Sequence, residues 1–379
     1  MAKRNSEGYW VESLERWQCN VTNDDGQRKT FTCKTPGKKG KLTVERKADE
    51  WLESGAKDGS IRVSAAFDSF IEHIKGQGTS KTYWRPYTSI GESWIKPYIG
   101  TKRLASVTES ELESILQKAR NKGLAEKSIK NIRSCIMAFL KYARKSKMTT
   151  LHPEELTMPK GAKPSEKFTL TEAEYQVLMD SDKTTFYRKE VEEWYIHAFR
   201  FAVLMGYRPG ELAGLQERDI KGDIVSTVRG ISEYDDITNL KNKNAQRKKK
   251  LNDLAKKELE AQRDMLKKRG VISPWLFPQP NGGPIDHDKY RVALTRYLKH
   301  NNIGKRTLKD GSTRYLTPYE FRHTWVSFQD EMPDGLKKRA IGWSKSFGGD
   351  QYNHKLESDT DRIAAFEDAK FKGIMQDKK

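Results

Sequence analysis

The chain has 379 residues, and its 71 lysines and arginines outnumber 52 aspartates and glutamates to give a formal net charge of +19. This length predicts two to three domains, and the basic excess favours nucleic acid as a partner over a merely soluble basic protein. Three cysteines without metal-ligand spacing argue against a disulfide scaffold and a metal site. No apolar run is long enough to span a membrane and no signal-peptide core is present, so we expect a cytoplasmic, nucleoid-associated protein without a membrane partner.

Residues 1–57 are predicted to form a small module of three strands and a helix. Aromatic and β-branched runs lie at 9–11, 16–21 and 30–33, with a turn signal at 23–26 and a helix at 44–54. Cys19 and Cys33 could face each other across this sheet, although ordinary apolar packing is the simpler interpretation. Arg16 and Arg28 are candidates to contact DNA, because β-ribbons read DNA; a solvated sheet face is the alternative.

Residues 60–155 are predicted to be all-helical. Helices are expected at 63–74, from a capping box at Thr108 to 121, and at 127–147, and the stretch 82–98 is rich in aromatic residues. The last helix has an apolar stripe, and its basic residues off the stripe either contact DNA or face solvent: Lys130, Arg133, Lys141 and Arg144. Residues 156–165 have the composition of a linker, and 166–379 are predicted to be a mixed α/β, mainly helical domain.

The segment around Arg208 predicts an elbow between two helices. A helix over 191–205 is stopped by Gly206, and Pro209 opens the next helix. Arg208 can then project into a cleft, where Glu211 can orient it by a hydrogen bond. A purely structural Arg–Glu pair is the alternative.

Strands are expected at 224–229, 234–240 and 248–251, with a basic hairpin over 241–250 between the last two. Such a hairpin could lie along a DNA backbone through residues such as Arg247 and deliver a lysine to a reacting phosphate. A run of lysines can equally be a solvated tip.

A helix is predicted to start sharply at Thr317-Pro318, with Glu320 completing a capping box. Tyr319, Arg322 and His323 are spaced by three and four residues and are expected to share the face opposite the apolar stripe. Because a helix N-terminus also favours anions, this face is predicted to hold a phosphate. A surface Arg–His pair is the alternative.

In this order, the segments resemble the tyrosine recombinase (phage integrase) family. They are Arg208-Pro-Gly-Glu211, the basic hairpin, Tyr319-Glu-Phe-Arg322-His323, Gly342-Trp343 and Tyr352, with nine residues from Trp343 to Tyr352. The resemblance implies a multi-domain fold: an arm-type DNA-binding domain at 1–57, a helical core-binding domain at 60–155 and a catalytic domain at 166–379.

The resemblance also implies the role of each site residue. Tyr352 would attack the scissile phosphate, forming a 3′-phosphotyrosine, while the guanidinium groups of Arg208 and Arg322 clamp the phosphate oxygens. The remaining roles are as follows: Lys241, or alternatively Lys243, protonates the leaving oxygen; His323 assists proton transfer; Trp343 donates to the phosphate; and Glu211 supports the arginines. Tyr319 stands where the family usually has His or Lys, and Trp343 replaces the commoner His.

No metal and no cofactor is implied. The expected partner is double-stranded DNA, at core-type and arm-type sites, bound by a homotetramer that joins through a C-terminal helix at 359–374; packing of this helix onto its own domain is the alternative. DNA-bending accessory proteins and an excisionase are further expected partners, and the reaction would pass through a Holliday junction while integrating and excising a mobile element. The competing interpretations are a catalytically inactive DNA-binding regulator with the same fold, and a related resolvase or topoisomerase.

Overall fold

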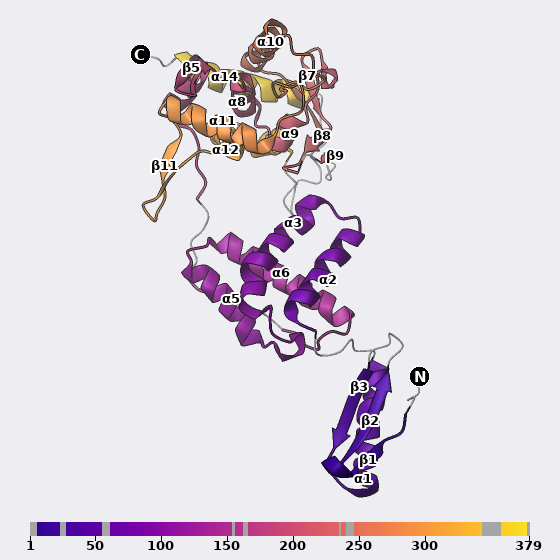
Figure 1. The fold of residues 1–379 in the computed structure, drawn as a ribbon. Coiled ribbons are helices and arrows are strands. Elements are labelled where there is room, and N and C mark those ends of the chain that lie inside the picture. The colour runs from indigo at the N-terminus through magenta and orange to yellow at the C-terminus, as the bar shows by residue number, and fades with distance from the viewer. Residues whose placement is uncertain are drawn as a thin grey trace. The chain divides into compact units, whose positions relative to one another are not determined.

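The computed structural model describes residues 6–22, 28–54, 61–153, 156–161, 166–234, 236–239, 246–342 and 358–376. The chain divides into two units, Met1–Ser165 and Glu166–Lys379 (Figure 1). The expected fold class is confirmed: small antiparallel sheets accompany a mainly helical chain. Within the described segments, no helix has both the length and the apolar character needed to cross a membrane.

The first unit begins with an antiparallel sheet of order β1-β2-β3, covered by one helix. Its elements are β1 (Tyr9–Val11), β2 (Arg16–Thr22), β3 (Arg28–Cys33) and α1 (Gly37–Ser54). The helix starts seven residues before the expected Val44, because its first two turns lack the apolar spacing that marks the rest. The strand register pairs Cys19 with Phe31 and Cys33 with Trp17, so the two cysteines do not oppose each other.

The helical part of the first unit has its own core. Its elements are α2 (Val63–Gly76), α3 (Lys81–Ile90), a π-helical segment (Gly91–Ile95), α4 (Lys96–Ile99), α5 (Glu109–Asn121) and α6 (Glu126–Lys145). The predicted capping box is confirmed, since the Glu111 backbone N–H donates to the Thr108 hydroxyl at 3.4 Å and the Thr108 N–H donates to the Glu111 carboxylate at 3.2 Å. The aromatic-rich stretch 82–98 is helical throughout, as expected, with a π-helical turn from Gly91, where an added Cβ would lie only 2.1 Å from the Phe67 ring.

The second unit surrounds a single large apolar core. Its helices are α7 (Glu172–Asp180), α8 (Ile196–Met205), α9 (Pro209–Ala213), α10 (Asp253–Lys268), α11 (His287–His300), α12 (Pro318–Phe328), α13 (Asp334–Ile341) and α14 (Ser358–Gln376). Its strands are β4 (Lys183–Phe186), β5 (Lys189–Glu192), β6 (Ile220–Lys221), β7 (Ile224–Thr227), β8 (Arg229–Ile231), β9 (Ile237–Asn239), β10 (Arg247–Lys250), β11 (Lys305–Thr307) and β12 (Thr313–Tyr315).

Three predictions for the second unit were wrong in detail. The helix expected from Val191 begins at Ile196, and the preceding residues form the hairpin β4–β5. The strand expected over 224–229 is two strands in different sheets: β7 pairs with β10 and β6, while β8 pairs with β9. The basic run is therefore not flanked by mutually paired strands in the described part of the chain, because β9 and β10 belong to separate sheets.

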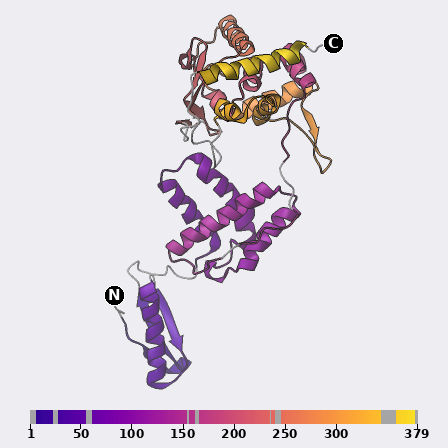
Figure 2. The ribbon, with the colours of Figure 1, turned by 180° about the vertical axis from the view of Figure 1, so that it is seen from behind.

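The C-terminal helix α14 packs onto its own unit, across which it lies in Figure 2. Ile363, Phe371 and Ile374 are at most 3% exposed within the core that also contains Tyr175 and Phe328. The alternative that this helix packs onto its own domain therefore describes the single chain, and a role of the helix in joining subunits stays a prediction.

Candidate active site

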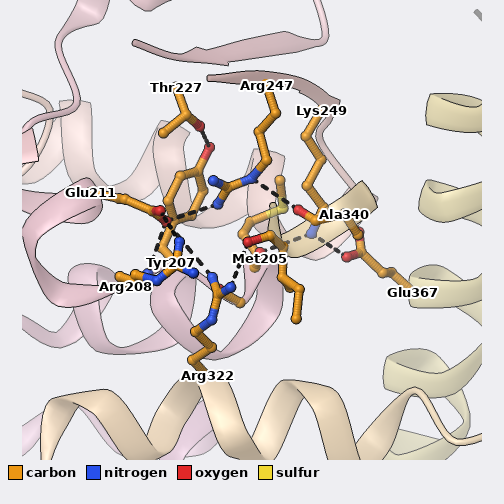
Figure 3. A network of polar contacts seen from close by, with 12 residues as sticks. Met205, Tyr207, Arg208, Glu211, Thr227, Arg247, Lys249, Arg322, Ala340 and Glu367 are labelled. Atoms are coloured by element: carbon orange, nitrogen blue, oxygen red, sulfur yellow. Dashed lines mark hydrogen bonds and ion pairs between the residues drawn. The ribbon is translucent and has the colours of Figure 1, made fainter. Parts of the chain in front are cut away.

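Three arginines from separate segments come together in the second unit around the carboxylate of Glu211. Arg208 precedes α9, Glu211 lies within α9, Arg247 lies on β10 and Arg322 on α12, and all three arginines point toward Glu211 (Figure 3). We call Arg208, Arg247 and Arg322 the arginine cluster. Segments over a hundred residues apart thus build one site.

The elbow at Arg208 forms as the local sequence predicts. Gly206 ends α8 in the left-handed conformation, with φ of 67°, and Pro209 opens α9. The Glu211 carboxylate accepts from the Arg208 backbone N–H at 3.2 Å and from its Nη1 at 2.5 Å. The expected Arg208–Glu211 pair is therefore present, and it fixes the guanidinium at the start of the helix.

Arg247 and Arg322 approach the same carboxylate from other elements. Arg247 Nη2 donates to Glu211 Oε2 at 2.9 Å, and Arg322 Nη1 lies 3.8 Å from that oxygen. Arg322 also donates to the carbonyl oxygens of Gly206, at 2.9 Å, and Ile341, at 2.5 Å. These contacts fix the guanidinium plane of Arg322 while leaving some of its five N–H donors for another acceptor.

The site carries more positive than negative charge in a buried setting. Glu211 is 3% exposed, Arg322 1% and Arg247 7%, whereas the side chain of Arg208 is 31% exposed. Burial opposes ionisation of Glu211, but the neighbouring arginines hold its pKa below the usual range. Burial and the repulsion of Arg208 lower the pKa of Arg322 to about 9. One carboxylate thus balances three guanidinium groups, so an anion bound here would relieve the repulsion between them.

The start of α12 places the two aromatic candidates beside the cluster. Glu320 accepts from the Thr317 backbone N–H at 2.8 Å, as the predicted capping box requires. The rings of Tyr319 and His323 meet edge-on, with centroids 5.2 Å apart, and Tyr319 is 44% exposed. Arg322 differs from the prediction of one shared face, because its side chain is buried while those of Tyr319 and His323 remain accessible.

His323 is held toward its neutral form. Burial lowers its pKa, and the positive charges of Lys167 and Arg322 lower it further, against the opposing effect of Glu320. A neutral imidazole at the edge of a cationic site can accept a proton.

Sequence reasoning missed a second charged pair behind the arginine cluster. Lys249 on β10 and Glu367 on α14 form an ion pair and are 1% and 0% exposed. A signal was present: alternate residues of a strand point to opposite faces, so Arg247 and Lys249 share a side, and the strand buries both while Lys248 is exposed.

Several residues expected to contact DNA have other contacts. Arg247 is buried, and besides Glu211 it donates through Nε to the Ala340 carbonyl at 3.0 Å, so it belongs to the site and not to a DNA-facing surface. On α6, Arg133 Nε donates to the Leu156 carbonyl at 2.8 Å, and Arg144 Nη1 donates to the Leu151 carbonyl at 3.3 Å.

The other DNA-contact candidates are less enclosed. Lys130 is exposed and pairs with Glu126 at 2.5 Å, and Lys141 is exposed. In the N-terminal sheet, Arg28 is exposed and Arg16 is half-buried.

Four predicted site residues lie outside the described residues: Trp343, Tyr352, Lys241 and Lys243. The turn expected at 23–26 also lies outside them. The roles of these four residues therefore stay predictions, whereas the arginine cluster, Glu211, Tyr319 and His323 have defined positions.

Comparisons with known proteins agree with this architecture. The model of the phage integrase family matches residues 169–358. The Tn1549 transposon integrase in complex with transposon right end DNA has a similar structure, with 17% identity and a TM-score of 0.62 over 80% of this chain and 98% of the other. A lambda integrase tetramer bound to a Holliday junction matches with 15% identity and a TM-score of 0.59, over 93% of this chain and 99% of the other.

A search of curated protein sequences found no match. The family model, however, spans half of the chain and covers the segments that carry the arginine cluster, Tyr319 and His323. The chain therefore belongs to the phage integrase family, the tyrosine recombinases, which break and rejoin DNA strands.

Proposed function

We propose that this chain is a site-specific recombinase of a mobile element, which cuts and rejoins DNA with Tyr352 as the nucleophile. The Tyr352 hydroxyl oxygen would attack the scissile phosphorus, forming a phosphotyrosine bond to the 3′ end while the bond from phosphorus to the 5′ oxygen breaks. Attack by the 5′-hydroxyl of a partner strand would reverse these bonds. The covalent intermediate conserves the phosphodiester energy, so no nucleotide cofactor is needed.

The observation that carries the proposal is the arginine cluster on one buried carboxylate. Three guanidinium groups on Glu211 leave an excess of positive charge, with Arg208 the most accessible of them. Guanidinium groups match phosphate oxygens in geometry, and donors fixed in advance stabilise negative charge that develops during phosphoryl transfer. We infer that Arg208 and Arg322 hold the scissile phosphate and that Glu211 keeps their spacing.

Proton transfer falls to the residues around the cluster. His323, with its lowered pKa, is suited to take the proton from Tyr352. Lys241 or Lys243 would protonate the departing 5′ oxygen, and Trp343 would donate its indole N–H to the phosphate. Tyr319, half-exposed beside His323, offers a hydroxyl donor where a charged residue is usual for the family.

Double-stranded DNA is the proposed substrate, bound by four copies of this chain through a Holliday-junction intermediate. The lambda integrase tetramer on a Holliday junction and the Tn1549 integrase on transposon DNA support this assembly and a mobile-element role. The N-terminal module is proposed to bind separate arm-type sites, and bending proteins or an excisionase would set the direction of the reaction.

The proposal is tested with a nicked suicide substrate built from the ends of the element, on which a covalent adduct is trapped. Wild type should form the adduct, Tyr352→Phe should form none, and Tyr319→Phe should still form it at a reduced rate. Adduct formation should persist in excess chelator. A wild-type chain that binds these ends without forming an adduct would favour the inactive regulator, and an adduct made by Tyr352→Phe would exclude Tyr352 as the nucleophile.

A further inference from the structure

A buried ion pair connects the C-terminal helix to the interior of the catalytic unit. Lys249 on β10 and Glu367 on α14 contact each other with side chains almost fully removed from solvent. Glu367 also accepts from Trp325 Nε1 at 2.9 Å and from Asn252 Nδ2 at 3.2 Å. The Glu367 carboxylate thus joins three elements, β10, α12 and the start of α10.

Contacts run from this pair to the arginine cluster through the end of α8 and through one turn of α12. Lys249 Nζ donates to the carbonyl of Met205, the last residue of α8, at 2.8 Å, and lies 4.7 Å from the centre of the Trp325 ring. The next carbonyl, that of Gly206, accepts from Arg322 at 2.9 Å. Trp325 lies one helical turn after Arg322 on α12. Figure 3 shows this row from Glu367 through Lys249 and Met205 to Arg322.

Stability alone does not explain why a buried ion pair connects α14 to β10. Burying two charges costs more than burying apolar side chains of similar size, and apolar side chains of α14 already seat the helix. Burial lowers the pKa of Lys249 to about 8 and raises the pKa of Glu367. The contact with Glu367 opposes the shift of Lys249, and the charges of Arg247 and Arg322 add to it. Glu367 therefore balances a cation that would otherwise add to the repulsion within the arginine cluster.

We propose that Glu367 is a positioning residue of the active site, which acts through Lys249 to fix the carbonyl at the end of α8 and the turn of α12 that orient Arg322. The proposal rests on the proposed function, because it assigns Arg322 to the scissile phosphate. It makes seating of α14 a requirement for the strand-cleavage step rather than for DNA binding.

The chain offers a matched control in Lys250 and Asp361, which pair at 2.6 Å between the same two elements, β10 and α14, but at the surface. In single-turnover cleavage of the suicide substrate by the full chain, Glu367→Gln should lower the rate about 10- to 100-fold, because small displacements of a clamping group cost this much. Asp361→Asn should stay near the wild-type rate, and neither variant should change the DNA dissociation constant by more than about twofold.

Hydrogen exchange provides a readout that does not depend on catalysis. In Glu367→Gln, exchange should rise in the peptides that contain Met205 to Arg208 and α12, and it should not rise in Asp361→Asn. If the wild-type chain forms no adduct, the proposed function is refuted, but the positioning role is not. If Glu367→Gln has the same cleavage rate and the same exchange as wild type, the positioning role is refuted, but the proposed function is not.

A second variant separates positioning from folding. Lys249→Met with Glu367→Leu replaces the pair by apolar groups of similar size, which is expected to preserve the fold. A folded double variant, with α14 protected from exchange, that still cleaves slowly supports the proposal. A double variant that cleaves at the wild-type rate overturns the proposal. If neither Glu367→Gln nor the double variant folds, the pair has a general structural role, and the proposal is also rejected.

Discussion

Replacement of Glu211 by glutamine should strongly destabilise the catalytic unit although it removes no volume. The carboxylate is 3% exposed and accepts from Arg208 Nη1 at 2.5 Å and Arg247 Nη2 at 2.9 Å. Glutamine keeps the shape of the side chain and one acceptor oxygen, but it leaves the buried guanidinium groups of Arg247 and Arg322 without a counter-charge. Arg208 contributes less to this effect because it is partly exposed.

The expected loss is about 3–5 kcal/mol, the usual cost of removing one partner from a buried ion pair. Two charge-assisted hydrogen bonds at about 1.5–3 kcal/mol each give a similar sum. The pKa of Glu211 is held low by the arginines, so its stabilising effect is present above the unfolded-state pKa and is lost as the pH falls through the folded-state value. Wild type and Glu211→Gln should therefore converge in stability under strongly acidic conditions.

Native-state hydrogen exchange of the full chain measures this loss in the peptides of α9 and α12, free from the unfolding of the first unit. Adding Arg247→Met to Glu211→Gln removes one of the uncompensated charges and should recover part of the loss. A decrease below about 1 kcal/mol in the single variant, the level of an exposed pair, would refute the reasoning.

Three further predictions concern local features. Gly206→Ala should destabilise the protein more than Gly222→Ala in thermal unfolding. Both variants incur the strain of a positive φ, about 1–2 kcal/mol, but only at Gly206 would the added Cβ lie 2.9 Å from Trp325; equal losses would contradict the packing argument. Thr108→Ala should cost about 1 kcal/mol of local stability in α5, seen by hydrogen exchange, and no change would refute the cap. Burial alone would raise the pKa of Glu174, but Arg306 and backbone N–H donors lower it to about 2. About 3 kcal/mol of stability should therefore be lost as the pH falls from about 4.5 to 2, and Glu174→Gln should flatten that part of the profile measured by denaturant unfolding.

Features set by local sequence were predictable. The caps at Thr108 and Thr317, the stop at Gly206 and the start at Pro209 depend on side chains within four residues, so the sequence specifies them directly. These signals placed Arg208 beside Glu211 correctly and brought Arg322 to a helix start.

Features set by distant partners were not predictable. The division of 224–229 into two strands depends on pairing with β10 on one side and β9 on the other. Lys249 is buried only because Glu367, over a hundred residues later, supplies its counter-charge. The inward turn of Arg322 likewise depends on carbonyl acceptors at Gly206 and Ile341, which no spacing rule on α12 reveals.

The alternation of burial along β10 changes what the net charge of +19 means. The logarithm of DNA affinity falls by about 0.9 per neutralised phosphate for each tenfold rise in salt concentration, so this slope counts only the cations that reach the DNA backbone. Arg247 and Lys249 are already matched by Glu211 and Glu367 and release no counterions, whereas exposed Lys248 can. The basic residues of β10 thus fall into two groups: those that are buried and paired with a carboxylate, and those whose charge remains available to a polyanion.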